Sequence, residues 1–419
     1  MISKQGKKIM PIILLLSWLL LTILVFVFGP YKYKINNSFL FYTYLFIVNV
    51  SLFLGYMRGQ KSYGRKCKIK INYIKFVQTS IIISFIYLII KLILTSGGDL
   101  ANVFTTFKDA SESYMKRTTN HPNLFSYIDI FILPVTIIAI TNGIFSSKKL
   151  NRGYRYCVYI MIIYSIASSI GSGTRAGIVG IVLIVTAAFL LGIYKKNIII
   201  KARHKIFLFL MAMIFFMGFF AYIGLLTESR SVYQPINPLT KKIPDKNFVL
   251  FKILPPQSHP AINNISFYLA HSYYRLNQAF DLPYNGIGFG LSNSYFIMDN
   301  IQELTGWTGP KNISYGLRLD MKQNGFFGNY WSTFYAWIAS DFTFPGTIII
   351  VYIIGYFFSL ALRDSLLSPN PLSVAVFCIL FGFIFHFAFN NPLQDGSGIT
   401  INLGITAIWL FSRNRNLTV

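Results

Sequence analysis

The sequence predicts an all-α polytopic membrane protein, and three observations lead to this fold class. Of the 419 residues, 54% are hydrophobic and only 12% are charged, which is more apolar surface than a soluble core can hide. The apolar residues gather in stretches of roughly 17 to 22, the length at which a helix crosses a bilayer. Lys and Arg gather in the loops on one side of these stretches, which is the bias that orients membrane proteins.

About ten apolar stretches follow one another along the chain, and each is expected to form a spanning helix. The first lacks a small-residue cleavage site after its apolar run, so we expect a retained helix rather than a removed signal peptide. The expected spans cover residues 10–28, 38–57, 76–95, 126–146, 156–171, 178–194, 206–226, 343–362, 371–390 and 397–412.

The loop charges predict the orientation. More than half of the 38 Lys and Arg residues lie on the side of the two termini, whereas the short loops of the other side hold only Lys32, Lys34, Lys108, Lys116, Arg117 and Arg175. Because basic loops stay in the cytoplasm, both termini are expected to be cytoplasmic. Most of the net charge of +25 then lies beside anionic membrane lipids, and no nucleic-acid partner is expected.

This topology divides the chain into three parts. Seven helices form an N-terminal transmembrane bundle (1–226), and three form a C-terminal bundle (343–419). Between them lies one long extracytoplasmic loop (227–342), where a short turn would have joined two helices, and long loops usually carry function. It gathers most of the exterior ionisable residues, namely Glu228, Arg230, His259, His271, Arg275, Asp281, Asp299, Glu303, Arg318, Asp320 and Asp341.

Two glycine-rich turns accompany the exterior arginines. Arg175 stands in Gly-Ser-Gly-Thr-Arg-Ala-Gly (171–177), where glycines let the backbone approach a phosphate and the guanidinium can bind it bidentately. The alternative for Arg175 is an anchor to lipid headgroups. Arg275 follows His271 by four residues, so both share a face if the segment is helical. A second turn, Tyr-Asn-Gly-Ile-Gly-Phe-Gly (284–290), is expected to be flexible and anion-binding.

These residues resemble the O-antigen polymerases (Wzy), a family of oligosaccharide repeat unit polymerases. The resemblance is carried by the turn around Arg175, by Arg275 followed after ten residues by Gly286, by the turn 285–290, and by the segment 324–346. It implies a GT-C-like architecture in the bacterial cytoplasmic (inner) membrane. It also implies a glycosyltransferase that polymerises undecaprenyl-diphosphate-linked oligosaccharide into O-antigen or capsular polysaccharide at the outer face. A chain-length regulator protein is the further partner that the resemblance implies.

The implied reaction is attack by a sugar hydroxyl with lipid diphosphate as the leaving group. The protein must then neutralise negative charge and accept a proton. Substrate binding is expected from three arginines and the second glycine turn, at Arg175, Arg275, Arg318, Gly286 and Gly288. The catalytic base is left open among His271, Glu228, Asp299 and Asp341, of which His271 has the most suitable ordinary pKa. The scattered cysteines and the widely spaced acids predict no metal, disulfide or other cofactor.

Two other functions compete with polymerisation. An O-antigen ligase shares nearly every feature, but ligases tend to carry a histidine late in the long loop, and residues 312–340 contain none. A lipid-linked oligosaccharide flippase is expected to show internal repeats and several intramembrane charges. The expected spans of this chain hold only three such ionisable residues, Lys91, Asp129 and His386. Lys91 is expected to extend toward the interface, Asp129 to meet water or the long loop, and His386 to be a hydrogen-bonded core residue.

Overall fold

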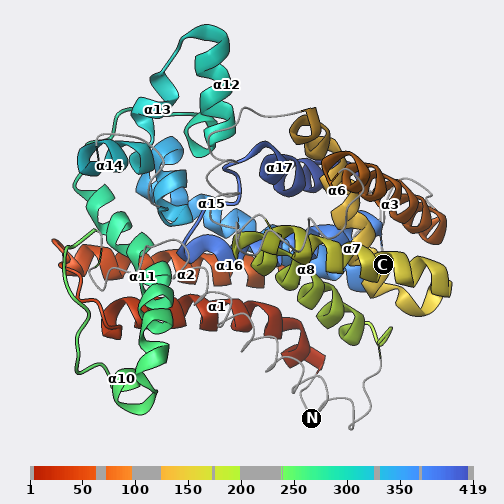
Figure 1. Ribbon diagram of the computed structural model, residues 1–419, viewed down its shortest axis with the longest axis horizontal. Helices are drawn as coiled ribbons and strands as arrows, with labels where there is room; N and C mark the ends of the chain where they lie inside the picture. Colours follow the sequence, from red (N-terminus) through yellow and green to blue (C-terminus); the bar gives the residue numbers. More distant parts are fainter. Residues whose placement is uncertain are drawn as a thin grey trace. The chain divides into compact units, whose positions relative to one another are not determined.

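The computed structural model describes residues 4–62, 72–96, 124–171, 175–198, 237, 239–324, 331–367 and 370–413, which are helical apart from turns and connections (Figure 1). Seven of the helices in these ranges are long and apolar enough to cross a membrane. By helix length and hydropathy the chain is therefore a multi-pass membrane protein, as its composition predicts.

The seven long helices fall on seven of the expected spans. They are α1 (Lys4–Phe28), α2 (Ser38–Lys61), α3 (Tyr73–Ser96), α6 (Leu124–Phe145), α8 (Arg175–Tyr194), α15 (Phe334–Leu367) and α16 (Pro371–Phe385), which continues into η4 (His386–Ala388). The expected span 156–171 lies in α7 (Arg152–Gly171), which is not among the seven. The span 206–226 lies outside the described residues, so the total of about ten stays a prediction.

The last expected span is a shorter, interrupted helix. It begins with α17 (Gly396–Ile399), passes through a π-helical turn, η5 (Thr400–Gly404), and ends with α18 (Ile405–Ser412). The hydroxyl of Thr400 donates a 2.8 Å hydrogen bond to the backbone oxygen of Ile130 in α6. This bond joins the π-helical turn to the neighbouring helix where the regular hydrogen-bond pattern changes.

The segment predicted as one long loop contains several helices in the part that the structure describes. These are α10 (Val249–Ile253), η2 (Pro256–Ser258), α11 (His259–Phe280), η3 (Leu291–Asn293), α12 (Tyr295–Thr305), α13 (Gly309–Ile313) and α14 (Tyr315–Asn324). Helix α11 combines apolar residues with Asn263, His271 and Arg275 on its buried side. The side of the membrane on which this segment lies stays a prediction.

The chain forms two compact units. The first contains Met1–Ser62, Gln234–Leu360 and Phe383–Ile399, and the second contains Tyr63–Tyr233, Ala361–Gly382 and Thr400–Val419. Helices α15 and α16 each contribute residues to both units. The three-part division made from the sequence refers to the membrane rather than to packing, and it stays a prediction.

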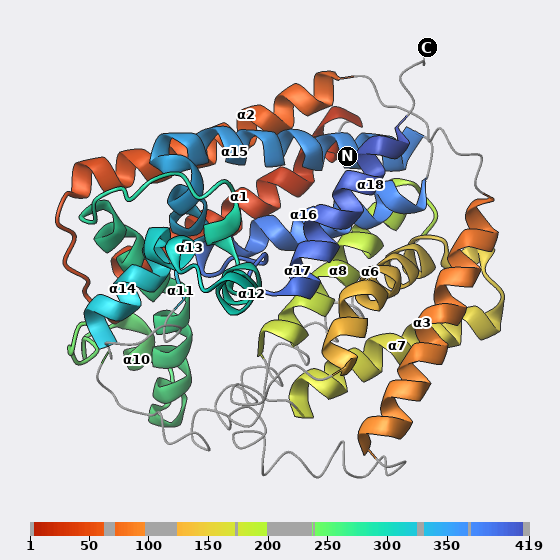
Figure 2. The same ribbon diagram turned by 90° about the horizontal axis from the view of Figure 1, so that it is seen from above.

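Within the first unit, small residues bring α2 and α15 together side by side (Figure 2). A Cβ on Gly55 would overlap the backbone oxygen of Tyr352, and a Cβ on Gly355 would overlap that of Leu52. One turn along α2, a Cβ on Gly59 would lie 2.6 Å from the Cβ of Ser359. The spacing Gly55-xxx-Gly59 is the small-residue pattern that lets helix backbones approach closely in membranes.

The long helix α15 is interrupted at Thr343, whose backbone is non-helical with φ 66° and ψ 166°. The Thr343 hydroxyl accepts a 3.3 Å hydrogen bond from the Gly346 N–H, and Pro345 has no N–H to satisfy. Thr343 therefore caps a new helix that runs to Leu367, after a short helix that ends near Asp341. The sequence-based start of this span, at residue 343, coincides with the interruption.

In the second unit, α3 and α6 are joined by an ion pair that the sequence analysis did not predict. The Lys91 ammonium lies 2.6 Å from Asp129 Oδ2, and the Tyr87 hydroxyl donates a 2.7 Å hydrogen bond to Asp129 Oδ1. Lys91 and Asp129 thus contact each other, and Asp129 also contacts Tyr87; the expected positions of the two charges relative to the membrane interface stay predictions. The spacing within each helix does not show this pairing, because it depends on how the two helices pack.

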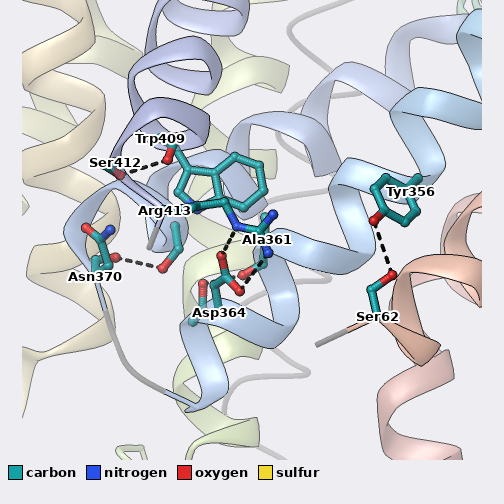
Figure 3. Close-up of polar contacts among 10 residues, drawn as sticks. Ser62, Tyr356, Ala361, Asp364, Asn370, Trp409, Ser412 and Arg413 are labelled. Carbon is teal, nitrogen blue, oxygen red and sulfur yellow. Dashed lines mark hydrogen bonds and ion pairs between the residues drawn. The ribbon is translucent and has the colours of Figure 1, made fainter. Parts of the chain in front are cut away.

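A second ion pair of this unit lies between α15 and the end of α18 (Figure 3). Arg413 donates through Nε to Asp364 Oδ2 at 2.8 Å and through Nη2 to Asp364 Oδ1 at 3.3 Å. Its guanidinium also lies 5.2 Å from the centre of a Trp409 ring. This bidentate pair, in which the Asp364 side chain is only 3% exposed, fixes the last described helix to α15.

In the first unit, the hydroxyl of Ser62, at the end of α2, donates a 3.2 Å hydrogen bond to the Tyr356 hydroxyl of α15 (Figure 3).

Candidate functional site

Arg275 lies in the first unit, with its side chain completely buried. Its Nη1 lies 2.6 Å from the Asp320 carboxylate, which is also completely buried. Nε donates to the Ser332 hydroxyl at 3.0 Å, and Nη2 donates to the backbone oxygen of Gly316 at 2.7 Å. The guanidinium therefore joins α11, α14 and the residues just before α15. Its predicted contact with diphosphate stays a prediction, and in this structure these donors point to protein acceptors.

His271 lies one helical turn before Arg275 and is 3% exposed. Its Nδ1 donates to the backbone oxygen of Phe267 at 2.9 Å, and its ring stacks on the Phe267 ring. Burial, followed by the nearby charge of Arg275, lowers the pKa of His271 to about 4, so the imidazole is neutral at pH 7. The expected helix face is confirmed by α11. The catalytic role of His271 stays a prediction.

The second glycine turn, residues 284–290, connects α11 to η3 and has the backbone that its glycines allow. Gly286 and Gly290 have φ of +115° and +88°, in the region that side chains disfavour. Gly288 is buried, and a Cβ there would overlap Asp341 Oδ1 and the Ser292 hydroxyl. Between the glycines, Tyr284, Ile287 and Phe289 are 40%, 54% and 79% exposed. The turn thus places apolar and aromatic groups at the surface and a carboxylate beneath.

Asp341 is completely buried under this turn. Its Oδ1 accepts a 3.1 Å hydrogen bond from the Ser292 N–H, and its Oδ2 accepts a hydrogen bond from the Asn293 side chain. Asn293 is fixed in turn, because its backbone oxygen accepts a 2.7 Å bond from Asn391. Asp341 therefore joins the end of the glycine turn to the short helix before Thr343. This contact involves two segments that the sequence analysis singled out separately, while a catalytic role for Asp341 stays a prediction.

Arg318 lies at the other end of the glycine turn and is half-buried. Its Nη1 donates a 2.8 Å hydrogen bond to the backbone oxygen of Pro283, the residue before Tyr284. The guanidinium lies 5.5 Å from the centre of the Tyr315 ring. Asn285 donates to the backbone oxygen of Asn312 at 3.2 Å, which adds a second contact between the turn and this helical region. Arg318 is thus a cation with solvent access beside exposed Tyr284.

The structure gathers most of the predicted site residues in the first unit. His271, Arg275, Gly286, Gly288, Arg318 and Asp341 all belong to it. Arg175 begins α8 in the second unit, but its side chain lies outside the described residues, as does Glu228. In the described ranges, no group of three His, Cys, Asp or Glu residues is arranged to hold a metal ion.

Three buried partners had no predicted role. Asp320 was only one of the exterior acids, and its pairing with Arg275 depends on α11 and α14 packing together, which no spacing indicates. Ser332 and Asn293 carried no signal of any kind. Gly316, whose backbone oxygen accepts from Arg275, also has to be small, since a Cβ there would lie 2.9 Å from the Trp337 ring, and only the packed structure shows this contact.

Comparison of the chain with protein-family models, with curated proteins and with solved structures gives no significant match. The site is therefore defined by its own geometry: a glycine turn with exposed aromatic groups, an accessible arginine at one end, and a buried carboxylate at the other.

Replacing Gly288 with alanine is expected to destabilise this site, because the new methyl group must displace the Asp341 carboxylate or the Ser292 hydroxyl. Overpacking of this kind costs about 1–3 kcal/mol. The melting temperature of the detergent-solubilised protein measures the effect. Gly153→Ala is the matched control, because a Cβ on Gly153 meets no atom within 4 Å. Equal melting of the two variants would show that Gly288 tolerates a side chain.

Proposed function

We propose that this protein is a polysaccharide polymerase, a glycosyltransferase that joins undecaprenyl-diphosphate-linked oligosaccharide repeat units at the outer face of the bacterial cytoplasmic membrane. A hydroxyl oxygen of one repeat unit forms a bond to the anomeric carbon of another. The bond from that carbon to the diphosphate breaks, the lipid diphosphate leaves with the electron pair, and the hydroxyl proton passes to a base. The multi-pass fold supplies the membrane setting that a lipid-linked substrate requires.

The observation that carries the proposal is the glycine turn between Arg318 and Asp341. Exposed Tyr284 and Phe289 offer rings and Ile287 an apolar side chain at the surface, and aromatic faces pack well against sugar rings. The guanidinium of Arg318 lies beside the start of this turn, within reach of an anionic group on the same ligand. A ligand with both sugar and diphosphate matches this combination.

The proposal gives the arginines different roles. Arg318 is half-buried and contacts the leaving diphosphate, where a cation offsets the charge that develops as the glycosidic bond breaks. Arg275 is a positioning residue, because its buried guanidinium holds α14, and with it Arg318, against α11. The side chain of Arg175 lies outside the described residues, so its expected contact with diphosphate stays a prediction.

Reconstitution of the purified protein with lipid-linked repeat units and no other substrate tests the reaction class. A ladder of repeat multiples with release of lipid diphosphate is the expected product. Transfer of sugar to a lipid A core acceptor, when that acceptor is added, without a ladder would instead establish a ligase. Movement of single repeats across the bilayer with no new bond would establish a flippase.

In this assay, Arg318→Ala is expected to lower the rate of ladder formation about 10- to 100-fold, the equivalent of one charge-assisted hydrogen bond. Arg318→Lys keeps the charge but loses the bidentate fork, so it should recover only part of the rate. Lys322→Ala is the matched control, because it removes an exposed cation one turn along the same helix. Native rates in both Arg318 variants, at native abundance, would remove Arg318 from the proposal.

A further inference from the structure

A lysine-rich segment, residues 239–256, precedes α11 and contains none of the candidate site residues. Four lysines in it, Lys241, Lys242, Lys246 and Lys252, are all exposed, and Asp245 is its only acid. The side chain of Asp245 is used locally, since its Oδ1 accepts a 2.9 Å hydrogen bond from the Asn247 N–H. The segment therefore presents a strongly positive surface.

The same segment also exposes large apolar side chains. Ile243, Val249 and Ile253 are 63%, 62% and 70% exposed, and Leu250 and Leu254 are 42% and 40% exposed. Five such residues close together are unusual on a surface that faces only water. Apolar groups interspersed with lysines are typical of a segment that lies in the interface of a bilayer.

Hydrogen bonds in and just before this segment place it at the end of a membrane-spanning helix. The Asp245 N–H donates a 2.8 Å hydrogen bond to the backbone oxygen of Pro30, two residues after α1 ends at Phe28. Asn237 donates through its side chain to the Tyr33 hydroxyl at 3.1 Å in the same α1–α2 connection. Because α1 crosses the membrane, the residues just after it lie at the level of the headgroups. Figure 1 shows α10 beyond the end of α11 that extends past α1.

We propose that residues 239–256 form an interfacial anchor that binds the anionic phosphate headgroups of membrane phospholipids. The exposed apolar side chains of α10, together with Ile243, insert among the upper acyl chains, and the four lysines contact phosphate groups. The anchor holds the first turn of α11 at the bilayer surface, and so fixes the helix that carries His271 and Arg275. This inference is independent of the proposed reaction, because it requires only a bilayer with anionic lipid.

Nitroxide spin labels in proteoliposomes test the insertion. The labels are attached to single cysteines at Val249 and Ile253, after Cys67→Ser, Cys157→Ser and Cys378→Ala. A label at Leu304 is the control, since this apolar residue of α12 is 83% exposed and lies outside the segment. In vesicles of phosphatidylglycerol and phosphatidylcholine, labels at 249 and 253 should collide more with oxygen than with a water-soluble nickel chelate. The label at 304 should show the reverse.

Two results would overturn the insertion. If the labels at 249 and 253 collide with the nickel chelate as often as the label at 304 does, the segment faces water. Labels that neither reagent reaches would show that another part of the chain or a second copy covers α10.

The headgroup contact has its own test in the same samples. Replacing the four lysines with glutamine should reduce the immersion of the labels in the mixed vesicles to the value seen with phosphatidylcholine alone. Equal immersion in both lipid compositions would overturn the binding of anionic headgroups. Ladder formation by the lysine variant is measured in parallel, so that failure of the anchor and failure of the proposed reaction are distinguished.

Discussion

Asp320→Ala is expected to lower the free energy of unfolding by about 3–5 kcal/mol, because it leaves the Arg275 guanidinium buried without its counter-charge. The two side chains are completely buried and 2.6 Å apart, so water cannot replace the lost carboxylate without opening the packing. The melting temperature and the amount of folded protein in membranes both measure the loss.

Asp299→Ala is the matched control for this effect. Asp299 also lies 2.6 Å from a cation, Lys311, but its side chain is 60% exposed, so its loss should cost about 0–1 kcal/mol. A second variant distinguishes an uncompensated charge from a missing contact. Arg275→Met with Asp320→Leu removes both charges and should recover much of the stability lost by Asp320→Ala alone. Equal effects of Asp299→Ala and Asp320→Ala would contradict the importance of burial.

The second large effect is expected from Gly55→Leu, which should separate α2 from α15. The new side chain would have to occupy the position of the Tyr352 backbone oxygen, and a backbone atom cannot move aside as a side chain can. We expect loss of most folded protein, with Gly55→Ala intermediate at a cost of about 1–3 kcal/mol. Size-exclusion profiles of the solubilised protein before and after heating measure this.

Gly180→Leu in α8 is the control for an added side chain in an apolar helix, because a Cβ on Gly180 meets no atom within 4 Å. It should remain close to the native protein in abundance and melting. A Gly55→Leu variant that elutes and melts like Gly180→Leu would show that the close approach of α2 and α15 is not required.

The sequence predicts the helices well because the signal is local. An apolar run of sufficient length forms a helix whatever its neighbours, and seven of the expected spans are helices of spanning length and hydropathy. The expected start of a span at residue 343 also has a local cause, since Thr343 and Pro345 suit the first turn of a helix. The Gly55-xxx-Gly59 pattern is also local, but it was not predicted, because only the partner helix shows what it is for.

The candidate site could be predicted only in part, because its geometry depends on contacts between distant segments. The residues 271, 275, 288, 318 and 341 were identified as chemically notable, and the structure places them in one unit. The complete burial of Arg275 and Asp341 could not be predicted, because it depends on packing between segments far apart in the sequence. Arg275 and Asp341 have the residue types of a binding site, yet their polar atoms contact Asp320, Ser332 and Asn293 in other segments.

The ion pair between Lys91 and Asp129 has a consequence for how the chain enters the membrane. Helix α3 alone would carry an uncompensated ammonium, and α6 alone an uncompensated carboxylate, each at a cost of about 2.5–3.5 kcal/mol at the bilayer centre and less near a helix end. Brought together at 2.6 Å, the two charges form a neutral pair. The two helices are therefore most stable in lipid as a packed pair, so α3 gains its full preference for the bilayer only once α6 has been synthesised.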